Sequence, residues 1–295
     1  MNTKLLSEKA LRIIDQYAHF HIGQTASTSG DMGAARRDTA TFAIPGGAIA
    51  TSPAGGICSV PYFNNNRRDG IRAGLRALGG KGSPRDIYEE VEILTLREKI
   101  QPKNFTDETL KKFLVDHNIG IDCSGFAYYV LTAESLARDK GTLDRHLSFP
   151  FAKGIMGAFR AKFRPAENTN VRTLAHNKNS RVINPSEIQP GDFISMLRKT
   201  IAEGGTATDE PSHILIIHQV EYQNFIPITI HYTHSMAWPT DGVYGHGIRT
   251  GRIEITDPKN PLLEQRWIES EKINDHFTYA RATKSITEIR RLNWF

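Results

Sequence analysis

Hydrophobic residues recur at helical spacing in the first half of the chain and at strand spacing in the second half. The helical spacing predicts helices over residues 1–20, 67–78, 84–100 and 106–117, and one more beginning near residue 122. Short apolar and β-branched runs predict strands over residues 193–197, 213–222, 226–236, 248–255, 265–268 and 278–282. Because the helices precede the strands in chain order, the sequence predicts an α+β fold with an antiparallel sheet.

The first third of the chain differs in composition from the rest. Residues 21–60 are rich in glycine, alanine, serine and threonine and show little periodicity, which predicts a long loop. We therefore expect residues 1–100 to form a helical and loop region that wraps the core, and residues 101–295 to form the main domain. With 295 residues, of which 39% are hydrophobic, the chain is long enough to bury a sizeable core.

The strongest candidate for chemistry is Cys123, one of two cysteines. Apolar residues at Phe126, Val130 and Leu131 follow it at helical spacing, so the cysteine would lie in the first turn of a helix that Asp122 caps. Backbone N–H groups at a helix start have no partner within the helix, and together with the helix dipole they favour a thiolate over a thiol. We therefore expect Cys123 to be a reactive nucleophile with a lowered pKa.

A cysteine nucleophile needs a histidine to take its proton and a third polar group to orient the imidazole. His213 opens an apolar strand and follows Cys123 in the chain, which favours it as the base. On the next strand, His231 and His234 point to opposite faces, because side chains alternate along a strand. We expect the cysteine helix to pack against the face of Ile230, which is also the face of His234, and so predict His234 as the third residue. A one-residue bulge in this strand would invert that choice.

Four short motifs occur in an informative order. An Asp-Cys-Ser-Gly-Phe segment at 122–126 starts a helix, a Gln-Pro-Gly-Asp-Phe segment at 189–193 leads into a strand, Ser212-His213 opens the next strand, and His234-Ser235 closes the one after. This arrangement resembles the NlpC-like cell-wall peptidases, which are cysteine hydrolases with a papain-like fold, over roughly residues 119–255. The resemblance implies a papain-like catalytic domain that uses no cofactor and no metal.

The resemblance also implies an activity and a set of roles. The activity is hydrolysis of amide bonds in peptidoglycan stem peptides or related peptides, through a thiolate and a histidine base. Carried over to this chain, the resemblance makes Cys123 the nucleophile, His213 the general base and acid, and His234 the residue that orients the imidazole. The backbone N–H of Cys123 would form part of the oxyanion hole, and Asp122 and Ser124 would help to hold the free amine of the substrate.

Two features depart from the family pattern. Members carry a Pro-Tyr pair shortly before the cysteine, whose tyrosine lines the active site, whereas the nearest match here is Pro61-Tyr62, about sixty residues upstream. The helices between Tyr62 and Cys123 would then be an insertion. The separation between Cys123 and His213 is also longer than the core of the family requires, which places a second insertion at residues 139–185.

The formal charge of +5 is concentrated in this second insertion, since residues 139–185 contain nine lysines and arginines against three acids. A helix is expected near residues 151–163, followed by an asparagine-rich loop. Such a segment is consistent with an electropositive cleft wall that attracts an anionic polymer such as murein. It is equally consistent with a solvated insertion whose charge keeps the protein soluble, and the sequence leaves both interpretations open.

Other classes of function are disfavoured. Two cysteines are too few for a disulfide framework, so we expect both to be reduced and Cys58 to serve packing. His231 and His234 point to opposite faces of a predicted strand, which disfavours a zinc site, and the glycine-rich segment at 79–83 predicts a turn rather than a phosphate loop. An aromatic and basic signature for nucleic-acid binding is missing. No segment has the length of a membrane span or the pattern of an export signal, so a wall substrate would be reached by another route.

Two alternatives remain open. The same order of cysteine and histidine occurs in transglutaminase-like and amidase-type relatives of papain. A non-catalytic module that binds cell wall or peptide could also keep the fold without the chemistry. The sequence determines neither the oligomeric state nor the bond that is cut.

Overall fold

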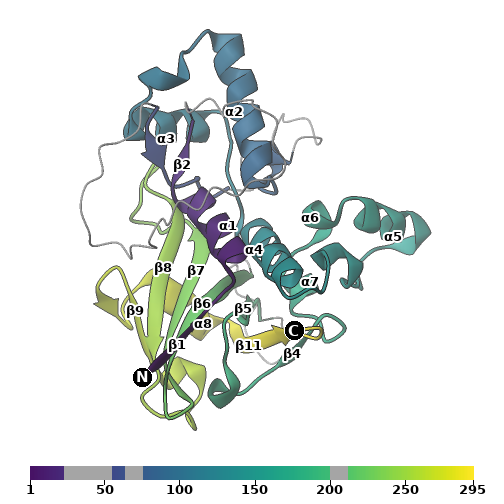
Figure 1. Ribbon diagram of the computed structural model, residues 1–295, viewed down its shortest axis with the longest axis vertical. Coiled ribbons are helices and arrows are strands. Elements are labelled where there is room, and N and C mark those ends of the chain that lie inside the picture. Colours follow the sequence, from purple (N-terminus) through teal and green to yellow (C-terminus); the bar gives the residue numbers. More distant parts are fainter. Residues whose placement is uncertain (23–54, 64–75, 200–211) are drawn as a thin grey trace.

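The computed structural model describes residues 1–22, 55–63, 76–199 and 212–295. Within these residues, the structure contains a nine-stranded antiparallel sheet (Figure 1). Eight of its strands follow the order β10-β9-β8-β7-β6-β5-β11-β4. The ninth strand, β1, pairs with the second half of β6, whereas β5 pairs with the first half. Its strands are β1 (Asn2–Leu5), β4 (Ser180–Val182), β5 (Phe193–Leu197), β6 (His213–Gln223), β7 (Ile226–Met236), β8 (Gly247–Glu254), β9 (Arg266–Glu269), β10 (Lys272–Ile273) and β11 (Ile286–Leu292). A separate small sheet pairs β2 (Phe20–His21) with β3 (Ile57–Cys58). The predicted α+β class with an antiparallel sheet is confirmed.

Eight α-helices accompany the sheet in the described ranges. They are α1 (Glu8–Ala18), α2 (Pro84–Glu98), α3 (Asp107–Asp116), α4 (Cys123–Ala137), α5 (Gly154–Phe163), α6 (Pro165–Asn168), α7 (Val171–Leu174) and α8 (Phe277–Lys284). Local capping explains where three of them begin: Ser83 and Thr106 form capping boxes at α2 and α3, and Asp122 caps α4. The helices predicted over residues 84–100 and 106–117, and the one near residue 122, are confirmed.

One face of the sheet is covered by α1 and α4, which run side by side across it (Figure 1). Phe126 of α4 is fully buried and meets Tyr17 of α1 edge-on, with ring centroids 5.6 Å apart. Both belong to a hydrophobic core that includes Phe193 and Ile216 from the sheet. Buried residues of α2 join the same core, so the described part of residues 1–100 packs together with α4.

The opposite face carries a second core, built around Trp267 and Tyr232 and covered by α8. Ile230 belongs to this second core, whereas α4 packs on the face of Ile214 and Ile216. The expectation that the cysteine helix packs on the isoleucine face of β7 is therefore wrong. Both faces of this sheet are buried, so an apolar face alone does not identify the helix that covers it.

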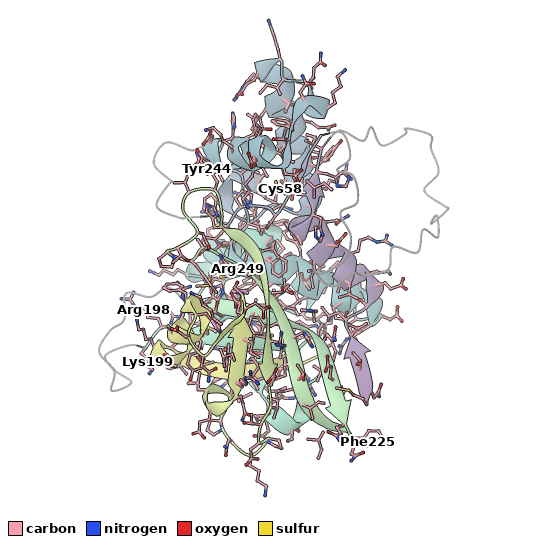
Figure 2. The ribbon with its side chains drawn as sticks, turned by 90° about the vertical axis from the view of Figure 1, so that its left-hand side faces the viewer. Cys58, Arg198, Lys199, Phe225, Tyr244 and Arg249 are labelled. Atoms are coloured by element: carbon pink, nitrogen blue, oxygen red, sulfur yellow. The ribbon has the colours of Figure 1, made fainter. Side chains whose placement is uncertain are left out.

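The hairpin of β6 and β7 sets the register at the site described below. Asn224 and Phe225 both have positive φ angles, 50° and 65°, as in a type I′ turn, and Phe225 lies exposed at the tip (Figure 2). Two register shifts follow along the ladder, one near the turn and one further on. The second shift reverses the first. Ile216 therefore pairs with Thr233, as it would if the two-residue turn were followed by a ladder without bulges.

Three segments differ from the prediction. Residues 278–282 lie within α8 and not in a strand, because the side chain of His276 caps a helix there. Residues 2–5 form β1 and not the start of a helix, because they pair with β6. The strands β4 and β11 are absent from the sequence prediction, and their partners are distant in the chain.

Two predicted segments fall outside the described residues: most of the helix over 67–78 and most of the loop over 21–60. None of the helices in the described ranges is both long and apolar enough to cross a membrane.

Candidate active site at the start of α4

Cys123 is the first residue of α4, as predicted, and its side chain is buried. Asp122 caps the helix, because its Oδ1 accepts a hydrogen bond from the N–H of Gly125 at 2.6 Å. Gly125 also lies against the backbone of the preceding loop, so that an added Cβ would come within 2.6 Å of the Gly80 carbonyl oxygen. The Asp-Cys-Ser-Gly segment is therefore shaped by a close tertiary contact as well as by the start of a helix.

His213 and His234 contact each other, and His213 directly precedes a residue that is bonded to this cysteine. Both are fully buried, and Nε2 of His213 lies 2.8 Å from Nδ1 of His234. The backbone N–H of Ile214, the residue after His213, donates a hydrogen bond to the sulfur of Cys123. Nδ1 of His213 is buried and has no hydrogen-bond partner within the part of the chain that the structure describes. This nitrogen is therefore available to a proton from another source.

Beyond His234 lies a buried carboxylate that the sequence pattern does not identify. Oε2 of Glu269 lies 3.4 Å from Nε2 of His234 and accepts a hydrogen bond from the Tyr232 hydroxyl at 2.7 Å, while Oε1 accepts one from Thr278 at 3.1 Å. Burial acts to raise the pKa of Glu269, but His234, the hydrogen bonds and the neighbouring His276 together hold that pKa below its usual value. Glu269 is therefore ionised at neutral pH.

This carboxylate favours one arrangement of protons on the two imidazoles. A negative oxygen beside Nε2 of His234 favours a proton on that nitrogen, which leaves the lone pair of the neutral ring on Nδ1. Nδ1 of His234 then accepts the proton of Nε2 of His213 across the 2.8 Å contact. The lone pair of His213 is therefore on Nδ1, the nitrogen without a partner among the described residues. A histidine in this state is a base.

His231 lies outside this chain of contacts. Its Nε2 lies 2.9 Å from Oε1 of Glu221, and both of these side chains are 23% exposed. His213 contacts His234 and not His231. Strand alternation along β7 therefore distinguishes the two histidines. The face of β7 that carries His234 is, however, the one opposite to the face that α4 covers.

Burial, with a further contribution from the Asp122 carboxylate, raises the pKa of the Cys123 thiol to about 12. The charges of Lys81 and Arg281 and the N–H of Ile214 act in the opposite direction without overcoming burial. The expected lowering of the thiol pKa by the helix start is therefore wrong for the resting protein. Desolvation of a buried sulfur outweighs the partial charge of the helix end.

The resting pair is a thiol and a neutral imidazole. Burial lowers the pKa of His213 well below its usual value, and the neighbouring His234 and Arg281 act in the same direction. A proton therefore has to pass from Cys123 to His213 during a reaction, because neither group holds its charge beforehand.

Alkylation of Cys123 is accordingly expected to be slow at neutral pH and to accelerate as the pH rises toward 10. A pKa of about 12 leaves a thiolate fraction at pH 7 that is about 10³-fold smaller than that of an unperturbed thiol. Mass spectrometry after timed treatment with iodoacetamide, with glutathione as the reference thiol, measures this rate, and peptide mapping separates Cys123 from Cys58. Rapid labelling of Cys123 at pH 6 would show a preformed thiolate and contradict the neutral resting pair.

Tyr62 lies beside the residue that precedes Asp122, although about sixty residues of chain separate it from Cys123. The backbone of Tyr62 pairs with that of Ile121, and the N–H of Ile121 donates to the carbonyl of Pro61 at 2.9 Å. Burial raises the pKa of Tyr62, and the charges of Cys123 and Asp122 raise it further. The Pro-Tyr pair is thus adjacent to the cysteine in space, with α2 and α3 inserted between them in the sequence.

The ammonium group of Lys81 occupies the space next to Asp122 and Ser124. Its Nζ donates to Oδ1 of Asp122 at 2.9 Å, to the hydroxyl of Ser124, and to the carbonyl of Thr169 at 2.9 Å. These three bonds use all three donors of the ammonium. The two residues that the resemblance assigns to a substrate amine therefore already hold an amine from the chain itself.

Lys81, Glu269 and Arg281 are residues of the site that the sequence pattern misses. Arg281 is buried on α8, and its charge acts on the pKa values of Cys123, His213 and Tyr62. Glu269 carries a usable signal, because it is two residues from Trp267 and so shares a strand face with a large apolar side chain. Lys81 lies in a glycine-rich turn, and no local pattern distinguishes it there.

The Pro-Gly-Asp motif before β5 is structural. Asp192 forms two contacts with the guanidinium of Arg291, at 2.7 and 2.9 Å, and accepts the N–H of Gln189 at 2.7 Å. The motif fixes a turn into the sheet and takes no part in the site. Among the described residues, no group of three or more histidine, cysteine, aspartate or glutamate side chains could hold a metal ion, and Cys58 and Cys123 are free thiols.

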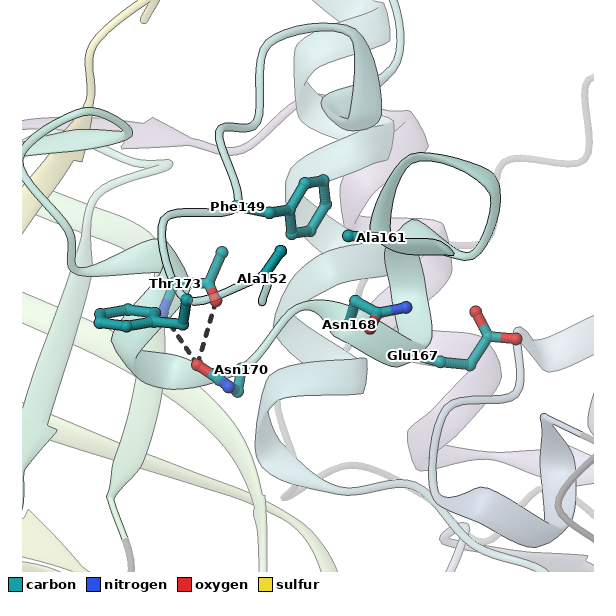
Figure 3. A pocket seen from close by; sticks show the side chains of 8 residues that line it. Phe149, Ala152, Ala161, Glu167, Asn168, Asn170 and Thr173 are labelled. Carbon is teal, nitrogen blue, oxygen red and sulfur yellow. Dashed lines mark hydrogen bonds between the residues drawn. The ribbon is translucent and has the colours of Figure 1, made fainter. Parts of the chain in front are cut away.

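A cavity of about 220 Å³ lies in the basic insertion (Figure 3). It is lined by Phe149, Phe151, Ala152, Ala161, Glu167, Asn168, Asn170 and Thr173. None of the three candidate catalytic residues lines it. Its wall is connected to the site through Thr169, whose carbonyl holds Lys81.

No protein-family model, no curated protein and no solved structure matches this chain. The functional conclusion therefore rests on the geometry of the site and on the motifs of the sequence.

Proposed function

We propose that the protein is a papain-like cysteine hydrolase that cleaves amide bonds in peptidoglycan stem peptides or related peptides. The observation that carries the proposal is the ordered contact from Glu269 through His234 to His213, which leaves Nδ1 of His213 without a described partner, next in the chain to Ile214, whose N–H bonds to the thiol. A buried ring nitrogen that has no partner in the described part of the chain is available to accept a proton.

In the proposed mechanism, Cys123 transfers its thiol proton to Nδ1 of His213 as the sulfur attacks the carbonyl carbon of the substrate. The carbonyl oxygen becomes an oxyanion, for which the N–H of Cys123 at the start of α4 is a donor. The positive charge of Arg281 favours the sulfur anion, since it acts to lower the pKa of Cys123.

The second half of the cycle returns the proton. The C–N bond breaks, His213 gives its proton to the leaving amine, and the acyl group remains on the sulfur of Cys123. A water molecule then loses a proton to His213 and attacks the thioester. This step releases the carboxylic acid and restores the thiol. Throughout, Glu269 and His234 compensate the positive charge that develops on His213.

The contacts of Lys81 favour substrates whose amine is acylated over substrates with a free amine. A second ammonium at Asp122 and Ser124 would meet the charge of Lys81 at close range, in a site where both residues are already bonded to it. A peptide stem attached at its amino end, as in intact wall, carries no such charge. We therefore propose an endopeptidase or amidase that acts within a chain.

Replacement of Lys81 by methionine is expected to change this preference. The Lys81→Met variant frees Asp122 and Ser124, so kcat/KM for a free-amine peptide should rise about ten-fold or more relative to the N-acetylated peptide. Paired kinetic assays on the two peptides measure the ratio, and Lys103→Met, at an exposed lysine, serves as the matched control. An unchanged ratio in a folded Lys81→Met protein would remove Lys81 from substrate selection.

Digestion of purified murein tests the proposed activity directly. Chromatography with mass spectrometry should detect soluble fragments that carry one added water at a peptide amide, released by the wild-type protein. Tight binding to murein without any cleaved product, on intact wall and on N-acetylated stem peptides alike, would favour the non-catalytic binding module. Transfer of the acyl group to an added amine in preference to water would favour the transglutaminase-type alternative.

A further inference from the structure

Helix α5 presents an apolar surface to solvent. Four of its large side chains are strongly exposed: Ile155 and Met156 at 81%, Phe159 at 59% and Phe163 at 74%. Large apolar side chains with this exposure are ordinary when isolated, but a contiguous group marks an interaction surface. These four residues are called the α5 stripe below.

The stripe is continuous along one side of the helix. Its members are spaced i, i+1, i+4 and i+8, which places them within one narrow sector of a helix with 3.6 residues per turn. The rings of Phe159 and Phe163 stack with their centroids 5.7 Å apart, so adjacent members touch. The opposite side of the helix packs on the protein, because Ala161 is buried there and lines the cavity of the insertion (Figure 3).

Positive charge surrounds the stripe. Lys153, Arg160, Lys162 and Arg164 lie within or next to α5, and the segment 153–164 contains no acidic residue. The nearest acid in the chain, Glu167, is paired with Arg76 and Arg164. The helix therefore combines an exposed apolar stripe with flanking cations.

We propose that α5 docks the protein on an anionic lipid surface, with the α5 stripe inserted at the boundary of headgroups and acyl chains and the flanking cations among the headgroups. A helix with large apolar residues on one side and lysine and arginine beside them lies in the plane of such an interface. Lysine and arginine keep their charged ends in water while their stems lie along the apolar layer. The position of α5 at the outer edge of the molecule leaves it open to a flat surface (Figure 1).

The other candidate occupants fit less well. A second copy of the chain, docked stripe to stripe, would bring two sets of four cations together. A soluble polyanion such as murein would satisfy the charges but would leave the apolar side chains in water. An anionic lipid surface satisfies both features of α5.

Vesicle co-sedimentation of the full chain tests the proposal. The wild-type protein should pellet with vesicles of phosphatidylcholine and phosphatidylglycerol, and binding should fall at least about ten-fold on vesicles of phosphatidylcholine alone or when salt is raised to 0.5 M. The double variant Ile155→Ser/Phe159→Ser should lose binding by at least about ten-fold, since it removes most of the insertable apolar surface.

Two matched controls separate this surface from general effects. Leu96→Ser changes an exposed apolar residue of α2, which is 79% exposed, and should bind as the wild type does. Arg160→Glu/Lys162→Glu should lose binding, whereas Lys9→Glu/Arg12→Glu, the same charge change on α1, should retain most of it. Equal loss in both charge variants would show that only net charge matters and would overturn the assignment to α5.

Two further results would also overturn the proposal. One is an absence of vesicle binding by the wild-type protein. The other is a wild-type dimer in solution that Phe159→Ser dissociates, because a second copy would then cover the stripe. The proposal is independent of the hydrolase activity, since the α5 variants are expected to cleave a soluble N-acetylated peptide at the wild-type rate.

Discussion

Replacement of Cys123 by alanine is expected to abolish amide hydrolysis and to leave the protein folded. Removal of the nucleophile in a hydrolase of this kind lowers kcat by at least about 10⁴-fold. The cost to stability is small, about 1 kcal/mol, because the side chain loses a single sulfur atom and the cap of α4 comes from Asp122. Release of a chromogenic amine from an N-acetylated peptide measures turnover, and thermal unfolding measures stability.

The second cysteine provides the control. Cys58 lies in the short strand β3 and packs against the main core, and burial raises the pKa of its thiol to about 12, as it does for Cys123. The two thiols therefore have similar acidity, and in the described residues the N–H of Ile214, next to His213, bonds to Cys123. Cys58→Ala should keep full activity. Residual turnover of Cys123→Ala above about 1% would exclude Cys123 as the nucleophile.

Replacement of Glu269 by glutamine is expected to lower kcat on the order of 10³-fold with little change in KM. A neutral amide no longer holds the proton on Nε2 of His234, so the proton order along the pair is lost and Nδ1 of His213 is no longer reliably the lone-pair nitrogen. Steady-state kinetics on the N-acetylated peptide measures both constants.

A pH profile distinguishes this positioning role from a merely structural one. The acid limb of kcat/KM for the wild-type protein should lie below pH 6.5, because burial lowers the pKa of His213 and a base is active above its pKa. Loss of the Glu269 charge makes a protonated imidazole still less favourable. The acid limb of Glu269→Gln should therefore move to lower pH, although its plateau rate falls. A loss of stability alone would not move the limb.

The pair formed by His231 and Glu221 is a natural matched control. It is also a contact between a histidine of β7 and a glutamate, here at 2.9 Å with the glutamate on β6, but it does not touch His213. Glu221→Gln and His231→Ala should therefore keep most of the activity, whereas His234→Ala should lose it. A larger loss for His231→Ala than for His234→Ala would contradict the proposed order of contacts.

The fold was predictable where local chemistry decides it. Helix α4 begins at Cys123 because Asp122 is a good cap and apolar residues follow at helical spacing, and both are visible in the sequence. The strands β6 and β7 were predictable from their apolar runs. Residues 278–282 and 2–5 were not, because a cap from His276 and pairing with β6 decide their structure.

The candidate site likewise has features that local patterns predict and features that they do not. Strand alternation separates His234 from His231, and motif order brings Cys123 and His213 into consideration together. Alternation does not reveal which face α4 covers, because both faces of the sheet are buried. It therefore selects His234 for a reason that the structure corrects.

The sequence by itself determined the local features: the helix start at Cys123, the strand that His213 opens, and the opposite orientations of His231 and His234. Only the tertiary structure decided which distant residues join them. Tyr62, Lys81 and Glu269 reach the site from loops and strands far along the chain, and no local pattern records such contacts. The sign of the pKa shift at Cys123 was also a tertiary property, because the cost of desolvating a thiolate depends on the whole core that surrounds it and exceeds the effect of the helix end.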